Sequence, residues 1–520
     1  MELERIAEIE RATGSGRGEF FRLGMALLFI VAIMLFAASK GGQPSYLLVI
    51  AAMIGGYMAM NIGANDVANN VGPAVGARAL TLTGAVLIAA VFEAAGALIA
   101  GGEVVGTIKK GIIDPALISN ADVFVWLMIA ALLAGALWLN LATLLRSPVS
   151  TTHSIVGGVL GAGIAAGGWD VANWSRMGQI AASWVISPVL GGVIAAGFLY
   201  LIKRTITYKS DVLAAAKRMV PILVAIMAWA FGAYLVMKGL KKVWPVSIGA
   251  ALASGAGLAA VVYVIAKSLV NRASSRLEDA RQDVNRMFTI PLIFAAALLS
   301  FAHGANDVAN AVGPLAAIND AILSGQIAQK AAIPLWIMVI GAMGIAIGLG
   351  LYGPKLIRTV GSEITELNQM RAYCIALSSA ITVIVATHLG LPVSSTHIAV
   401  GAVFGVGFLR EYLKASYARM IVEIEHHHQG ADHEEVEAFL DRFEAAALKE
   451  KGAMLKELKR QKASAALSKK ERKALKKLYR TELVKRSAVL RIIAAWIITV
   501  PVSGLLAAML FYTIRGMMLP

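Results

Sequence analysis

Two nearly identical polar stretches, NIGANDVANNVG at residues 61–72 and GANDVANAVG at residues 304–313, stand out in a hydrophobic chain. Each places an aspartate and two asparagines directly after a long apolar run. The matching aspartates, Asp66 and Asp307, are 241 residues apart (307 − 66). An ionisable residue inside such hydrophobic segments is costly and usually marks a binding site or a pathway. The apolar runs on either side of these two stretches therefore show which class of fold the chain adopts.

The composition is that of a membrane protein. Of the 520 residues, 58% are hydrophobic and 15% are charged, and the mean hydropathy is +0.70, whereas soluble domains carry about 25% charged residues. One or two buried helices of a soluble enzyme would not account for the many long apolar runs. We expect an all-α polytopic protein of the cytoplasmic membrane with about 12–13 membrane segments, each needing about 20 apolar residues. The runs lie at 25–38, 82–100, 123–145, 188–202, 221–237, 246–266, 290–302, 333–353 and 489–512.

A second pair of motifs repeats at nearly the same spacing. SPVSTTHSIVGGV occupies residues 147–159 and LPVSSTHIAVGAV occupies residues 391–403, with their histidines 244 residues apart (397 − 153). Two motif pairs in the same order and at similar offsets indicate a duplicated unit. We therefore expect two structural repeats whose polar motifs meet at a shared site near the membrane midplane.

The basic loops predict how the repeats are oriented. Lys and Arg gather in loops that face the cytoplasm, and the basic loops here are 203–211, 267–286 and 410–486. If each segment opened by Pro148 or Pro392 reaches across the membrane, all three loops lie on one side with the amino terminus. Seven crossings then separate the two polar stretches, which makes the repeats inverted. If each segment instead dips in and returns, the last loop faces away from the second, so the charge distribution favours inverted repeats with broken or hairpin helices.

Composition divides the chain into membrane and cytoplasmic parts. The formal net charge of +16 fits loops that face the cytoplasm and does not call for nucleic acid as a partner. The single cysteine, Cys374, excludes an intrachain disulfide framework and a cysteine metal cluster. The predicted parts are a cytoplasmic amphipathic lead at 1–22, an extra transmembrane helix at 23–44, a first repeat at 45–205, connecting transmembrane helices with a basic loop at 206–286, a second repeat at 287–410, a charged cytoplasmic helical loop at 411–487, and a C-terminal transmembrane helix at 488–520.

The first motif pair offers hard oxygen ligands for a small cation. Each copy carries a carboxylate between two amide side chains that lie about one helical turn apart. The glycine–proline pairs at 72–73 and 313–314 should interrupt the helix and release backbone carbonyls, which suits an alkali cation. Two other interpretations stay open: the aspartate carries a proton, or the cluster is only a polar contact between packed helices. The predicted cation-binding residues are Asn65, Asp66, Asn69, Asn306, Asp307 and Asn310.

The second motif pair offers an anion site. Consecutive hydroxyls follow a proline, which suits the first turn of a helix, where Ser and Thr cap free N–H groups. A helix N-terminus carries unpaired donors and partial positive charge, so two such ends meeting at the midplane would surround a tetrahedral oxyanion. Ordinary helix capping is the alternative for either copy alone. The predicted anion-binding hydroxyl residues are Ser150, Thr151, Thr152, Ser394, Ser395 and Thr396.

Three further ionisable residues belong to these segments. His153 and His397 end the hydroxyl motifs, and we expect them to support the hairpins by donating to a backbone carbonyl rather than to carry protons. Glu93, in AAVFEAAGALI, has no acidic counterpart in the matching stretch IMVIGAMGIAIG. It either contributes to ion coupling or pairs with a lysine or arginine of another helix.

The paired motifs closely resemble those of the PiT family of inorganic phosphate transporters. The resemblance covers roughly residues 45–205 and 287–410, and VGTIKKGIID at 105–114 also resembles the first half of the family. It implies two inverted repeats, phosphate uptake coupled to sodium or protons, and a role for the aspartates Asp66 and Asp307 in holding both phosphate and cation. The chain departs from eukaryotic members, which carry a second-half glutamate where this chain has Ala376.

We therefore expect a secondary active transporter that imports inorganic phosphate with sodium or a proton by alternating access. It would not be an enzyme, and it would use no organic cofactor and no metal beyond the coupling cation. Alternatives are a transporter of another oxyanion or of a metal–phosphate complex, and a membrane anion sensor that signals through 411–487, where a histidine-rich patch lies at 423–437. A homodimer is a further candidate assembly, and the identity of the cation stays open.

Overall fold

The computed structural model describes residues 2–39, 45–145, 149–239, 246–274, 281–327, 333–363, 367–426 and 486–518. These residues form helices joined by short turns, with one isolated bridge between Ile113 and Ala172. Within the described ranges, eleven helical segments are long and apolar enough to cross a membrane. The all-α membrane architecture is thus confirmed. The two helices α7 and α16, which start at the hydroxyl motifs, are not among the eleven.

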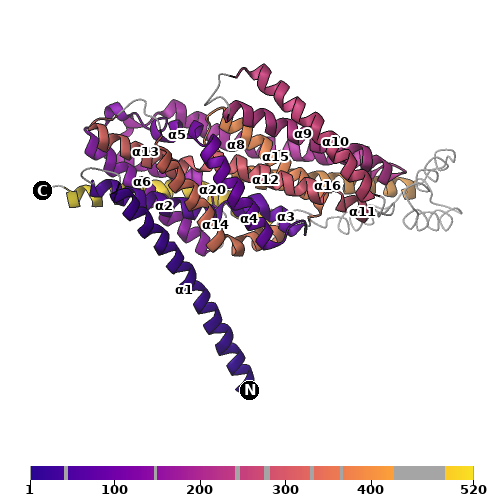
Figure 1. Cartoon of the computed structure of the whole chain (residues 1–520), viewed down its shortest axis with the longest axis horizontal. Helices are drawn as coiled ribbons and strands as arrows, with labels where there is room; N and C mark the ends of the chain where they lie inside the picture. Colours follow the sequence, from indigo (N-terminus) through magenta and orange to yellow (C-terminus); the bar gives the residue numbers. More distant parts are fainter. Residues whose placement is uncertain are drawn as a thin grey trace.

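The first helix joins two parts that the sequence separates. α1 runs without interruption from Glu2 to Ala38 and leaves the bundle at an angle (Figure 1). The predicted lead at 1–22 and the predicted membrane helix, as far as Ala38, are therefore one helix; residues 40–44 lie outside the described residues. Its membrane-long section, Gly18–Ala38, ends before α2 begins at Tyr46.

Each polar stretch breaks a helix at its aspartate or at the next residue. α2 (Tyr46–Asn65) gives way to α3 (Val67–Gly76) at Asp66, and α12 (Thr289–Asp307) gives way to α13 (Ala309–Ser324) at Val308. The predicted interruption at the glycine–proline pairs is wrong, because Pro73 and Pro314 lie inside α3 and α13. The Asp66 carbonyl oxygen accepts hydrogen bonds from the backbone N–H of Asn69 at 3.0 Å and from its side-chain Nδ2 at 3.2 Å, which tightens the turn there.

Each hydroxyl motif begins the second arm of a helical hairpin. α6 (Ala121–Leu144) is followed by α7 (Thr151–Gly167), and α15 (Gln369–His388) by α16 (Ser395–His426). α7 runs back along α6: a Cβ built on Gly158 would lie 3.0 Å from the carbonyl oxygen of Ala131, and Gly167 approaches Leu117, just before α6. The N-termini of α7 and α16 are thereby carried into the bundle by their first arms.

The two halves exchange equivalent contacts. A Cβ on Gly63 of α2 would lie 1.9 Å from the carbonyl oxygen of Ile345 in α14 (Leu335–Glu363). In the other half, a Cβ on Gly304 of α12 would lie 2.2 Å from the carbonyl oxygen of Glu93 in α4 (Leu82–Ala100). Each broken helix thus packs closely against a helix of the opposite half, an approach that only small residues permit. Because Gly63 and Gly304 are also 241 positions apart, these contacts support the predicted duplication.

The last helix occupies the place that α8 occupies in the other half. α8 (Trp174–Ile202) packs on α16, where a Cβ on Gly405 would lie 2.0 Å from the Gly192 carbonyl oxygen. α20 (Arg486–Met518) packs on α7, where a Cβ on Gly161 would lie 2.2 Å from the Gly504 carbonyl oxygen. We infer that α20 completes the second repeat, so that the predicted loop at 411–487 is inserted within that repeat. Residues 427–485 of this loop, with most of its histidine-rich patch, lie outside the described residues.

The remaining elements are short or connect the halves. Three segments flank the first hairpin: α5 (Gly102–Lys110), η1 (Pro115–Leu117) and η2 (Trp169–Val171). The short element η3 (Lys203–Thr207) follows α8 directly. α9 (Val212–Lys238) and α10 (Ile248–Ser274) form the connecting pair, and α11 (Arg281–Arg286) leads into α12. In Figure 1, α9 and α10 lie along one edge of the bundle.

The glycine contacts predict at which positions the fold tolerates a larger side chain least. Gly405→Val should destabilise the protein by at least about 1–3 kcal/mol, because the added side chain meets backbone that cannot move aside. Gly197→Val on α8 is the matched control, since nothing lies within 4 Å of the place that its Cβ would take. Thermal unfolding can be followed with a thiol-reactive dye, because the chain's single cysteine, Cys374, is fully buried. Equal midpoints for the two variants would contradict this account of the packing.

Candidate functional site

The two polar stretches meet at a buried cluster. Oxygen atoms of Asp66 and Asp307 and a ring nitrogen of His303 all lie within 4.8 Å of one another, a grouping that suits a cation. All three side chains are at most 1% exposed. The two aspartates therefore lie close together, as the sequence predicted. His303 was missed by the sequence reasoning; it precedes Asp307 by one helical turn, and its Nε2 lies 3.1 Å from Asp307 Oδ2.

Asp66 is bound by hydroxyls from both halves. Thr151, at the start of α7, donates its hydroxyl to Asp66 Oδ2. Thr396, at the start of α16, donates to Asp66 Oδ1 at 3.2 Å. Hydrogen bonds to an ionised group are among the stronger ones in proteins. The carboxylate therefore links the ends of the two hairpins, which belong to different repeats.

The second asparagine of each polar stretch reaches across to the opposite hairpin. Asn69 Nδ2 donates to Thr396 Oγ1 at 3.0 Å, and Asn310 Nδ2 donates to Thr152 Oγ1 at 3.3 Å. The two bonds are equivalent under the repeat, since Asn69 matches Asn310 and Thr152 matches Thr396. Each hairpin end is thus held by the broken helix of the other half, and neither half can form this site alone.

The first asparagine of each stretch holds the hairpin of its own half. Asn65 Nδ2 donates to Thr143 Oγ1 at 3.0 Å, and Asn65 Oδ1 accepts from the Val149 N–H at 3.2 Å. The Asn306 amide contacts Thr387 Oγ1 at 2.9 Å. Both residues were predicted to bind the cation. Their contacts place them at the bends of the hairpins, where they position the helix ends.

The predicted anion-binding residues lie at two helix N-termini that face each other. Ser150 and Ser394 act as caps: their Oγ atoms accept from the backbone N–H of His153 at 3.1 Å and of His397 at 3.2 Å. Thr152 Oγ1 donates to the Val393 carbonyl oxygen at 2.9 Å, which joins one hairpin end to the other. The hydroxyls of the first turns belong to Thr151, Thr152, Ser395 and Thr396, each 1% exposed.

The two motif histidines pack against each other. The ring centroids of His153 and His397 are 4.4 Å apart and nearly perpendicular, and Trp184 of α8 covers His153 at 3.8 Å. Trp184 Nε1 also donates to the Pro392 carbonyl oxygen at 3.1 Å. Ring packing across the repeat interface is thus one way in which these histidines support the hairpins, and the expected bond to a backbone carbonyl stays a prediction.

Glu93 pairs with a histidine, not with the lysine or arginine that the sequence suggested. Glu93 Oε2 lies 2.6 Å from His303 Nδ1, and Oε1 accepts from Asn70 Nδ2 at 2.8 Å. The chain of contacts continues through His303 to Asp307. All four side chains are buried, so a continuous polar path leads from α3 and α4 of one half to α12 of the other.

This polar path exists on one side of the site only. The 241-residue offset matches His303 to Ile62 and Asn70 to Ala311. The exchanged glycine contacts match Glu93 to Ile345. The positions equivalent to the glutamate, histidine and asparagine are therefore isoleucine, isoleucine and alanine. The site is symmetric in its aspartates and asymmetric in what surrounds them.

The buried polar atoms that have no hydrogen-bond partner among the described residues include two in the second-half motifs. They are Asn310 Oδ1, an acceptor, and Ser395 Oγ, a donor and acceptor. Their counterparts in the first half differ, since Thr151 is bonded to Asp66. Buried polar groups in native proteins are normally satisfied. An amide oxygen suits a cation and a hydroxyl suits an oxyanion, so these atoms fit a ligand seated near Asp307.

Comparison with known proteins identifies the family. The model of the phosphate transporter family matches residues 62–507. The chain belongs to the phosphate transporter family. A relative from Helicobacter pylori strain J99, named "Putative phosphate permease", is 54% identical over 98% of both chains, and one of the same description from Chlamydia trachomatis is 41% identical over 73% of this chain and 93% of its own. The solved structure of "The sodium-dependent phosphate transporter" has a TM-score of 0.75 and 30% identity, and covers 91% of this chain and 100% of that one.

This membership confirms several expectations. The matched family is one of transporters and not of enzymes, and its phosphate specificity agrees with the two hydroxyl-lined helix ends. The match also extends to residue 507, which includes much of α20. A multi-pass membrane protein is thus supported by the helices and by the relatives together.

Substitutions along the polar path from Asn70 to His303 should change the stability of this phosphate transporter family member in a specific order. His303→Ile alone should cost roughly 3–5 kcal/mol, because it leaves the buried Glu93 without its partner. The triple variant Asn70→Ala, Glu93→Ile, His303→Ile copies the apolar arrangement of the other half and should recover most of that loss. Dye labelling of Cys374 on heating measures both. A triple variant that unfolds at lower temperature than the single one would contradict this account.

Proposed function

We propose that the protein imports inorganic phosphate by symport with sodium, through alternating access between its two halves. One observation carries the proposal: two buried aspartates from matched motifs lie beside two helix N-termini that face each other. The helix ends suit an oxyanion, and the carboxylates suit cations. Sodium is favoured over a proton by the likeness to the sodium-dependent phosphate transporter.

The charges explain why phosphate and cations must enter together. Asp66, Asp307 and Glu93 are three buried carboxylates, and His303 is the one ionisable base that the described residues place among them. A phosphate anion brought beside these carboxylates would meet unscreened repulsion in a medium of low dielectric constant. Bound cations offset this repulsion, and their own cost of leaving water is offset in turn by the carboxylates. Coupling thus follows from charge balance inside the site.

Each group of residues has a distinct role in this proposal. The N–H groups and hydroxyls at the first turns of α7 and α16 hold phosphate. Asp66, Asp307 and the Asn310 amide oxygen supply ligands to sodium, while Asn65 and Asn306 fix the hairpin bends. Asn69 spans the halves through its bond to Thr396.

Glu93 and His303 make the two cation positions inequivalent. Asp307 is connected through His303 to Glu93, whereas Asp66 is bonded directly to hydroxyls. A sodium ion at Asp66 therefore competes with hydroxyl donors, and one at Asp307 competes with an imidazole. We expect the two ions to bind with different affinities, and Glu93 to contribute to coupling by setting the charge of the Asp307 side.

The helix connections support inverted repeats. The sequence argument assumed that the segments at Pro148 and Pro392 cross the membrane, whereas α6–α7 and α15–α16 are returning hairpins, which we count as no crossing. The crossings from the start of α2 to the start of α12 are then the α2–α3 helix, α4, α8, α9 and α10, an odd number. Basic residues near the start of α9, the end of α10 and the end of α11 then face the same side as the last turns of α16, which agrees with a cytoplasmic location. Rocking of the two halves about the shared site would expose it to each side in turn.

Uptake into proteoliposomes tests the proposal. Labelled phosphate should accumulate under an inward sodium gradient and not under a proton gradient alone. Asp66→Asn and Asp307→Asn should each lower sodium-driven uptake by at least about tenfold, the loss expected when a charged ligand is removed from a buried site. Asp122→Asn is the matched control, because Asp122 is exposed in the first turn of α6.

Four results would overturn or broaden parts of this proposal. If labelled phosphate fails to accumulate under either gradient, symport is refuted. If it accumulates only under the proton gradient, sodium coupling is refuted. Full uptake by both aspartate variants would refute the site. Unlabelled sulfate or arsenate that competes as well as phosphate would assign the site to oxyanions more broadly.

A further inference from the structure

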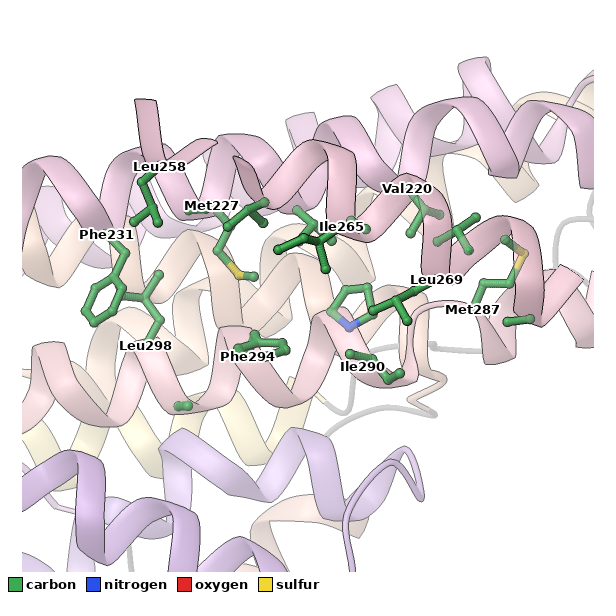
Figure 2. Close-up of a pocket in the computed structure, with 18 of the residues that line it drawn as sticks. Val220, Met227, Phe231, Leu258, Ile265, Leu269, Met287, Ile290, Phe294 and Leu298 are labelled. Carbon is green, nitrogen blue, oxygen red and sulfur yellow. The ribbon is translucent and has the colours of Figure 1, made fainter. Parts of the chain in front are cut away.

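An apolar groove of about 600 Å³ lies between the connecting helices and the second repeat. One wall is formed by α9 and α10, and the other by α12 with a contribution from Phe92 of α4 (Figure 2). In Figure 2 the side chains of Met227 and Ile265 point from one wall toward Phe294 on the other. The groove is separate from the aspartate site, because its lining includes none of the aspartates, asparagines or hydroxyl residues described above.

The groove is concave, unlike an ordinary lipid-facing helix surface. Its floor is buried: Val220 is 1% exposed and Leu298 is 3% exposed. Its rim is open, with Ile265 and Phe294 more than half exposed. The two connecting helices are locked to each other, since a Cβ on Gly255 would lie 2.8 Å from the Trp229 carbonyl oxygen. The groove is therefore a space between two packed layers and not the result of one loose helix.

The size and the direction of the groove match a lipid chain. Along α10, the lining extends from Leu258 to Ala273, which is about 22 Å at the rise of an α-helix. One leaflet of the hydrocarbon core is about 15 Å deep, so a groove of this length spans the leaflet and continues to the level of the headgroups. The volume also lies within the range of about 300–1,000 Å³ that is usual for ligand pockets. An acyl chain lying parallel to the helices fits these dimensions.

One end of the groove is basic. Arg286 lines it, and its side chain is 69% exposed, with one guanidinium nitrogen 3.4 Å from Asp283. Two further exposed basic residues are Arg218, near the start of α9, and Lys267, near the end of α10. On the proposed orientation this end faces the cytoplasm, at the depth of the headgroups. A guanidinium there can bind a phosphate through two parallel N–H donors.

We propose that this groove binds an anionic glycerophospholipid, with an acyl chain between α10 and α12 and the headgroup phosphate on Arg286. The groove abuts α12, the helix that ends at Asp307. A bound lipid therefore fills the space between the connecting helices and the helix that carries part of the transport site. The proposal does not depend on the coupling ion.

Photolabelling of the full chain in nanodiscs tests the lipid site. The probe is a phosphatidylglycerol that carries a diazirine in its acyl chain, with a phosphatidylcholine of the same chains for comparison. Adducts mapped by mass spectrometry should concentrate on α9, α10 and α12, and the phosphatidylglycerol probe should exceed the phosphatidylcholine probe there. Arg286→Gln should lower the phosphatidylglycerol adducts by about tenfold, the effect of losing a charge-assisted contact.

Two matched controls separate this site from general attraction to the membrane. Lys209→Gln removes an exposed charge just before α9, outside the lining, and should leave the labelling unchanged. Ala266→Phe should fill the groove and remove the adducts, whereas Leu505→Phe on the exposed face of α20 should not. Labelling spread evenly over α20 and the groove, or insensitive to both Arg286→Gln and Ala266→Phe, would overturn the proposal. A second copy of the chain cross-linked through the groove in place of lipid would also overturn it.

Discussion

The burial of two carboxylates at the interface between two halves is the constraint on which the rest of the structure depends. Asp66 and Asp307 lie together out of contact with water, where each charge must be satisfied by partners. Hydroxyls from two helix N-termini serve Asp66, and one of them comes from the opposite half. The hairpins bring those N-termini inward, and the glycine contacts allow the hairpins and broken helices to approach closely enough.

The duplication explains the symmetry of the site, and the departures from it are equally informative. The cross bonds of Asn69 and Asn310 are equivalent, as are the glycine contacts of the broken helices. The path from Glu93 through His303 has only apolar counterparts in the other half. A pair of identical half-sites would bind two identical ions. The polar path on one side instead surrounds the two aspartates differently, which is the basis for the proposal that their cation positions differ.

Sequence reasoning reached the site because its residues occur twice in matched order, so Asp66 and Asp307 could be placed together without a structure. It missed residues whose contact is with a part of the chain far away in sequence and whose motif occurs only once. His303 has no counterpart to draw attention to it, and its partner Glu93 lies 210 positions away. The helix breaks lie at Asp66 and Val308 and not at the glycine–proline pairs, whose Pro73 and Pro314 are inside helices. In the first half, the Asn69 amide binds the Asp66 carbonyl oxygen within the turn, a contact that the local sequence signal does not reveal. The repeat membership of α20 was hidden by the charged insertion before it.

Phosphate binding to the purified protein at varied sodium concentration tests the central claim most directly. The charge balance predicts that labelled phosphate binds weakly or not at all without sodium, and that its apparent affinity rises steeply as sodium is added, with choline unable to substitute. Measurement by scintillation proximity needs no gradient and so reports the site itself, apart from alternating access. Phosphate that binds equally well with and without sodium would show that the aspartates do not require cations before the anion, and would contradict the account.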